Sequence, residues 1–196
     1  MPDMDTETLT PADEEVMGRL QGGDEAALAV LMGRWELPVK RFLFRILGNT
    51  AEAEDLAQEV FVRVFMKRQT YRPGRRFSSW LFAIAANQAK NRLRWWKRRP
   101  VLSLGAWMEA GNDIPDEGAP PANSVLERKD DRRAEAVQKA VSELPLDERT
   151  AIVLFEYEGR SMAEIAQIAA CTAKAVENRL YRARRKLKLA LGVPDA

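Results

Sequence analysis

Hydrophobic side chains along the chain recur at helical spacing, and strand-like alternation is scarce. Apolar residues in the segment 35–47 fall at i, i+4, i+7, i+8, i+11 and i+12, which is one stripe on an α-helix. Gly48 is expected to end this helix, and Asn49 with Glu52 is expected to cap the next one. The apolar stripe of that second helix covers residues 53–65.

A basic loop at residues 71–76 interrupts the pattern, since it holds Pro73, Gly74 and three arginines. Ser78 is expected to cap a third helix, whose apolar positions run from Trp80 to Leu93. Residues 103–124 then carry four acids, no base, three prolines and three glycines, a composition typical of a flexible linker.

Helical periodicity returns over residues 126–191. Pro145 marks a helix start, Ser161 and Glu164 have the spacing of a capping box, and Thr172 is expected to cap the final helix. The sequence therefore predicts an all-α protein with two small helical domains joined by a flexible acidic linker. The predicted divisions are an acidic tail (1–11), a first domain (12–99), the linker (100–127) and a second domain (128–192).

Charge is segregated along the 196 residues, although Lys+Arg (31) and Asp+Glu (29) nearly balance. Residues 1–25 carry eight acids and one base, whereas residues 90–99 carry six bases and no acid. Residues 174–188 carry seven bases and one acid. Two basic segments on helices favour a polyanionic partner, which the net charge of +2 would not suggest.

The residue inventory argues against an enzyme. Histidine is absent, no P-loop motif is present, and the single Cys171 cannot form an internal disulfide or a cysteine-rich metal site. We therefore expect no catalytic residue, no cofactor, no bound metal and no small-molecule substrate. Because no leader pattern and no apolar run near 18 residues occurs, we expect a cytoplasmic protein without membrane insertion.

The final predicted helix divides into two faces. Its apolar face holds Val176, Leu180, Ala183 and Leu187, and its opposite face is basic and polar. Preceded by a short helix and a tight turn, this pattern indicates a helix-turn-helix that reads the DNA major groove. The alternative is a solvated basic helix that closes a small bundle.

Three ordered segments resemble conserved regions of bacterial sigma factors, in the extracytoplasmic-function group. Residues 55–61 (DLAQEVF) and 77–91 (FSSWLFAIAANQAKN), followed by the basic run to Arg99, resemble region 2. Residues 144–185 resemble region 4. The resemblance implies a specificity subunit that binds core RNA polymerase and promoter DNA and promotes melting, and that an anti-sigma factor holds inactive.

The resemblance also implies site residues. The side chains expected to bind core polymerase are Asp55, Leu56, Gln58, Glu59 and Phe61. Those expected to bind the unpaired −10 strand are Arg72, Arg75, Arg76, Asn87, Lys90, Asn91, Arg94 and Trp95. Those expected to bind the −35 duplex are Thr172, Lys174, Glu177, Asn178, Arg179, Tyr181, Arg182 and Arg185.

Several alternatives stay open at this point. Phe77 and Trp80 are stacking platforms or, more in keeping with their apolar face, core residues. Glu177 reads a cytosine or pairs with a neighbouring arginine, and at least one of Trp95 and Trp96 contacts DNA or lines the edge of the duplex. The whole chain is alternatively a stand-alone helix-turn-helix regulator, which would bind duplex DNA tightly without polymerase.

Overall fold

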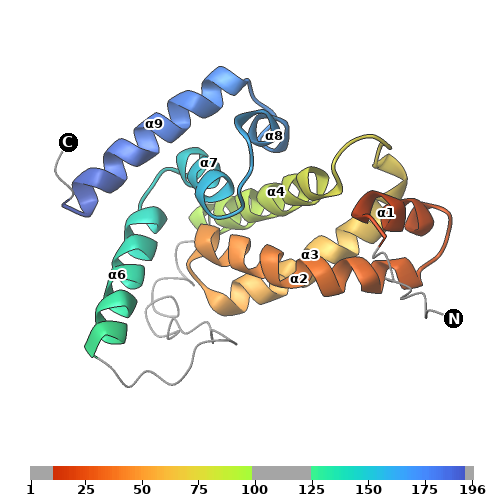
Figure 1. The fold of residues 1–196 in the computed structure, drawn as a ribbon, viewed down its shortest axis with the longest axis horizontal. Helices are drawn as coiled ribbons and strands as arrows, with labels where there is room; N and C mark the ends of the chain where they lie inside the picture. Colours follow the sequence, from red (N-terminus) through yellow and green to blue (C-terminus); the bar gives the residue numbers. More distant parts are fainter. Residues whose placement is uncertain (1–10, 99–124, 193–196) are drawn as a thin grey trace, which may run out of the picture.

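The computed structural model describes residues 11–98 and 125–192, with the side chains of residues 125–132 left aside. These residues form helices joined by turns, and no strand occurs among them, which confirms the all-α prediction (Figure 1). The elements in chain order are α1 (Asp13–Gln21), α2 (Ala26–Leu47), α3 (Thr50–Met66), η1 (Arg68–Thr70), α4 (Phe77–Arg98), α6 (Val125–Ser142), α7 (Leu146–Glu156), α8 (Met162–Ile168) and α9 (Ala173–Ala190).

The first half of the chain is a bundle in which α2, α3 and α4 pack on one another and α1 lies against α2 (Figure 1). Aromatic rings fill its centre. Phe42 and Phe82 meet edge to face with their centroids 5.2 Å apart, and Trp35 meets Phe82 at 6.0 Å. Phe61 and Phe77 are also buried, so the apolar stripes predicted from periodicity do form one core.

The residues predicted to end α2 and to cap the start of α3 do so in the structure. Gly48 ends α2 in the left-handed conformation with φ at 72°, and Asn49 accepts a 2.9 Å hydrogen bond from the amide of Glu52. The predicted cap at Ser78 is wrong. Because α4 begins at Phe77, Ser78 lies inside the helix, where its buried hydroxyl accepts a hydrogen bond from Arg160.

The second half of the chain consists of α6, α7, α8 and α9. Helix α9 packs its apolar face on α7 and α8, and Val176, Leu180 and Ala183 are buried there. The predicted linker (100–127) lies outside the described residues except for its last three positions, which belong to α6. The predicted acidic tail lies outside them as far as residue 10.

The two halves touch through α4 with α8 and α2 with α7. Arg149 of α7 crosses this boundary, where its guanidinium donates to the carbonyl of Ile46 at 2.5 Å, of Leu144 at 3.0 Å and of Ser142. Burial lowers the pKa of Arg149, and the three carbonyls hold its charge at the carboxyl ends of α2 and α6. One arginine thus ties the end of a first-half helix to the second half.

Candidate nucleic-acid and polymerase interfaces

The arginine side chains of the basic loop between η1 and α4 are exposed to solvent. Arg72, Arg75 and Arg76 are all exposed, and Gly74 turns the chain with φ at 86°. The rings at the two ends of the loop point inward instead, because Tyr71, its first residue, is 4% exposed and Phe77, which follows it, is fully buried. Phe77 is therefore a core residue, and the loop presents three guanidinium groups suited to phosphate.

The exposed face of α4 continues from this loop as a row of amide and positively charged side chains. The predicted residues Asn87, Lys90, Asn91 and Arg94 are all exposed, and Arg94 donates to the Asn91 amide oxygen at 3.1 Å. Trp95 is 47% exposed, whereas Trp96 packs against the core. Of the two tryptophans, Trp95 is the one whose ring a nucleic-acid base can reach.

The exposed face of α3 carries carboxylate and amide groups. Asp55, Gln58 and Glu59 are exposed, whereas Leu56 and Phe61 lie in the core with 1% and 2% exposure. Both apolar side chains lie beneath the exposed polar groups, so the surface that α3 offers to a partner is formed mainly by Asp55, Gln58 and Glu59.

Arg92 of α4 constrains the same patch. Its guanidinium pairs with Glu59 at 2.9 Å and with Glu52, both on α3. Glu59 therefore already has a cationic partner, while the exposed Asp55 and Gln58 offer their polar groups beside it.

Two residues of this face escaped the prediction. Val62 is 58% exposed and Met66 is 72% exposed, and both line a shallow groove with Asp55, Gln58 and Glu59. Their spacing of i+7 and i+11 from Asp55 puts them on the same side of α3, a signal present in the sequence. Exposed apolar side chains beside carboxylates are typical of a protein-docking surface.

The helix-turn-helix is built by local caps. Ser161 and Glu164 form the complete predicted capping box at the start of α8, and Thr172 accepts a 3.1 Å hydrogen bond from the Ala175 amide at the start of α9. Between the helices, Ala170 adopts a left-handed φ of 48°. The short turn therefore sets α9 across α8 (Figure 1).

The outward face of α9 carries the predicted −35 residues. Seven of the eight are exposed, namely Thr172, Lys174, Glu177, Asn178, Tyr181, Arg182 and Arg185. Arg179 is half-buried, since it donates to Asp147 and to the sulfur of Cys171, both at 3.3 Å. Cys171 therefore packs against the core in the turn between α8 and α9, and its sulfur accepts a hydrogen bond from Arg179.

Carboxylates neutralise part of the positive charge of α9. Glu148, 7% exposed, accepts from Lys186 at 2.8 Å and pairs with Arg182 at 3.4 Å, and Lys174 pairs with Glu177 at 3.0 Å. Arg185 has no ion pair in the described part of the chain. Glu177 therefore pairs within its own helix, but with Lys174 and not with the neighbouring arginine expected from the sequence.

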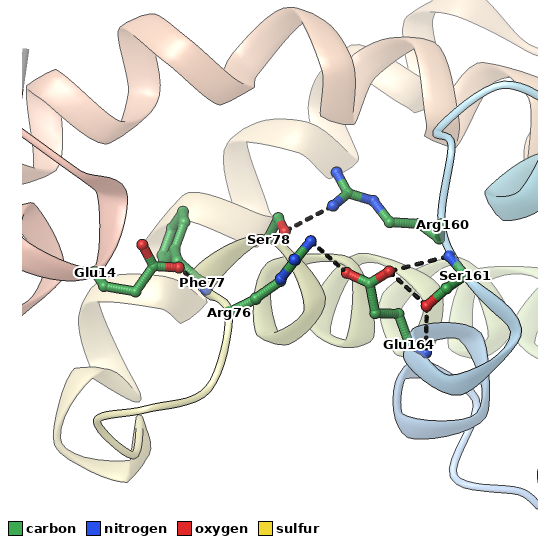
Figure 2. Close-up of polar contacts among 7 residues, drawn as sticks. All are labelled: Glu14, Arg76, Phe77, Ser78, Arg160, Ser161 and Glu164. Atoms are coloured by element: carbon green, nitrogen blue, oxygen red, sulfur yellow. Dashed lines mark hydrogen bonds and ion pairs between the residues drawn. The ribbon is translucent and has the colours of Figure 1, made fainter.

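The basic loop and the helix-turn-helix meet across the domain boundary (Figure 2). Arg76 pairs with Glu164 at 3.2 Å, and Arg160 donates to Ser78 at 2.8 Å. Hydrogen bonds from Ser161, with help from the charges of Arg76 and Arg160, lower the pKa of Glu164 despite partial burial. The guanidinium of Arg160 also lies over the rings of Phe82 and Trp35, 5.1 Å and 5.7 Å from their centroids.

The described residues also bear on metal binding and on membrane insertion. No cluster of three or more acidic or cysteine side chains there could hold a metal ion. None of the described helices is long and apolar enough to cross a bilayer.

Comparison with known proteins agrees with this geometry. Residues 31–99 match the family model described as Sigma-70 region 2, and residues 134–187 match that described as Sigma-70, region 4. The RNA polymerase sigma-H factor of Pseudomonas aeruginosa is 32% identical over 183 residues, 91% of this chain and 93% of its own. The ECF RNA polymerase sigma-E factor of Escherichia coli is 32% identical over 186 residues, 93% of this chain and 94% of its own.

Solved structures share the fold. CnrH in complex with the cytosolic domain of CnrY has a TM-score of 0.68 at 22% identity, over 94% of this chain and 100% of its own. RpoE of Bartonella quintana, in complex with the anti-sigma factor NepR, has a TM-score of 0.65 at 22% identity, over 85% of this chain and 98% of its own. By its family models, its relatives and its fold, this chain belongs to the sigma-70 family of RNA polymerase sigma factors, in the extracytoplasmic-function group.

Proposed function

We propose that this sigma factor attaches to core RNA polymerase through α3, binds the −35 duplex through α9 and binds the unpaired −10 strand through the basic loop and α4. The observation that carries the assignment of α9 is its division into two faces. Val176, Leu180 and Ala183 are buried, while Asn178 and Tyr181 point to solvent next to the arginines. A helix held by one face and polar on the other suits the major groove.

The loop and α4 suit a single strand. Arg72, Arg75 and Arg76 supply charge for phosphates, Asn87 and Asn91 supply amides for base edges, and Trp95 supplies an exposed ring. A protein that binds unpaired bases more tightly than paired ones shifts the duplex toward the open form by that difference in affinity. Melting therefore needs no nucleotide hydrolysis by this chain.

The face of α3 supplies the attachment to polymerase. Asp55, Gln58 and Glu59 provide acceptors for a basic partner helix, and Val62 and Met66 provide apolar area beside them. We place the protein in the cytoplasm, where bacterial RNA polymerase works. An anti-sigma partner is proposed from fold neighbours, one of which was solved with the anti-sigma factor NepR.

The test is run-off transcription by core polymerase over a mixed promoter library, with and without this protein. Discrete start sites that depend on the protein support the proposal and define its −10 and −35 sequences together. Loss of those starts on Asn87→Ala, with core binding retained, supports the assignment of α4. Tight binding to duplex DNA without polymerase, and no new start sites, would instead favour the stand-alone regulator.

A further inference from the structure

Helix α1 (Asp13–Gln21) precedes the segment that matches Sigma-70 region 2, yet it is part of the same core. Val16, Met17 and Leu20 are fully buried against the bundle. This packing fixes α1 firmly enough for its polar side chains to act at fixed positions. Two of those side chains, Glu14 and Gln21, reach segments that lie 47 or more residues later in the chain.

Gln21 holds the segment that leads into the basic loop. Its side-chain amide donates to the carbonyl of Arg68 and to the carbonyl of Tyr71, both at 2.9 Å. The side-chain amide of Gln69 in turn donates to the backbone carbonyl of Gln21, also at 2.9 Å. Three hydrogen bonds therefore join the end of α1 to the short helix η1 (Arg68–Thr70) and to the first residue of the loop.

Glu14 holds the other end of the loop. Its carboxylate accepts a 2.8 Å hydrogen bond from the backbone amide of Phe77, the first residue of α4 (Figure 2). The free amides at a helix N-terminus favour a negative charge, so Glu14 caps α4 from another helix. Tyr71 adds a hydrogen bond across the loop, from its hydroxyl to the carbonyl of Arg75.

We propose that α1 is a positioning element for the DNA strand, acting through Glu14 and Gln21 on the basic loop. This inference rests on the proposed function, which assigns the loop to the unpaired −10 strand. With both ends held, the exposed stretch of residues 72–76 loses less conformational entropy when a phosphate backbone binds its arginines. Glu14 and Gln21 would not themselves contact the DNA.

The first experiment measures the loop without DNA or polymerase. Trypsin cuts after Arg75 and Arg76, whereas Pro73 protects the bond after Arg72. In the full chain, Glu14→Ala is expected to speed cleavage at these two bonds, read by mass spectrometry. Glu15→Ala is the matched control, since Glu15 is exposed on the first turn of α1 and has no side-chain bond in the described residues.

The second experiment measures DNA binding by the holoenzyme. The probe is a labelled single-stranded oligonucleotide that carries the −10 segment selected in the transcription screen. Glu14→Ala is expected to weaken its binding about three- to tenfold, the range that loss of a helix cap allows. Glu14→Gln should restore most of the affinity, because its amide oxygen can still accept from Phe77. Binding of the −35 duplex and of core polymerase should not change.

Gln21→Ala tests the other end of the loop. It replaces Glu14→Ala in both experiments if circular dichroism shows that Glu14→Ala folds poorly. Faster cleavage with weaker −10 binding in either variant supports the proposal. Unchanged cleavage in both variants overturns it, and so does faster cleavage with unchanged −10 affinity. Failure of the proposed function would look different, because the wild-type protein would then direct no start sites while the trypsin result stood.

Discussion

Replacing Arg160 with alanine removes the side chain that enters the first-half bundle from the α7–α8 loop. Arg160 donates to Ser78 on α4 (Figure 2). Its guanidinium also lies over the rings of Phe82 and Trp35. The boundary also holds the pair of Arg76 with Glu164, in which the Arg76 side chain is 74% exposed. We expect Arg160→Ala to shift the free protein toward a form in which the two halves are apart.

The size of the shift follows from the contacts. A hydrogen bond from a charged group contributes about 1.5–3 kcal/mol, and a cation over an aromatic ring contributes about 1 kcal/mol. The buried Nε of Arg160 has no acceptor, which costs about 1–2 kcal/mol and offsets part of the gain. The net value of about 2 kcal/mol corresponds to roughly a 30-fold change in the closed-to-open ratio.

Single-molecule energy transfer measures this ratio. Dyes are attached at Gln58→Cys and Leu189→Cys, two exposed positions in different halves, in a Cys171→Ser background. Arg76→Ala should open the protein less than Arg160→Ala does, because an exposed ion pair contributes about 0–1 kcal/mol.

Arg185→Ala is the control, since it removes the same charge from the surface of α9. An unchanged distance distribution in Arg160→Ala, or equal opening in the control, would refute the reasoning.

Four further predictions concern stability and binding. Burial raises the pKa of Glu158 despite Arg45, Arg160 and Arg41, so its charge destabilises the fold above the ordinary carboxyl pKa. Glu158→Gln should therefore raise the thermal midpoint at pH 7 and leave it unchanged at pH 4. Ala170→Gly should stabilise the protein by about 0.5–1 kcal/mol in urea titrations, since φ is 48° there. Val62→Arg should weaken core polymerase binding about tenfold in fluorescence anisotropy. Arg185→Ala should weaken −35 binding alike for all sequences and reduce the salt slope by about 0.9.

The last three of these measurements each have a matched comparison. Gln167→Gly substitutes glycine inside α8 and should destabilise, in contrast to Ala170→Gly. Val30→Arg introduces the same charge on α2, away from the α3 face, and should leave polymerase binding intact. Arg19→Ala removes a surface arginine of α1 and should not change the salt slope of −35 binding. Equal effects within any pair would contradict the corresponding assignment.

The features that could be predicted from the sequence depend on neighbours along the chain. Asn49, Ser161 and Thr172 each accept from an amide three residues later, so residue type and spacing suffice to find them. The faces of α9 follow in the same way, because its buried and exposed residues alternate with the helical period.

The features that escaped prediction depend on contacts between distant segments. Ser78 has the right residue type for a cap, but its hydroxyl is bonded to Arg160, 82 residues later. The amide of Phe77 is instead capped by Glu14, 63 residues earlier. The packing of the two halves against each other likewise rests on Arg149 and Arg160, and nothing in the local pattern of either residue indicates a contact 103 or 82 residues away.

The cap that Glu14 places on α4 also bears on how the protein folds during synthesis. Every partner in the α1–α4 bundle, Glu14 and Asn49 included, is synthesised before α6. At about 5–20 residues per second, roughly 4–18 seconds separate the synthesis of Arg98 from that of Leu187. The first half can therefore complete its own bundle while the chain is still growing, with the α4 face around Ser78 uncovered until Arg160 arrives.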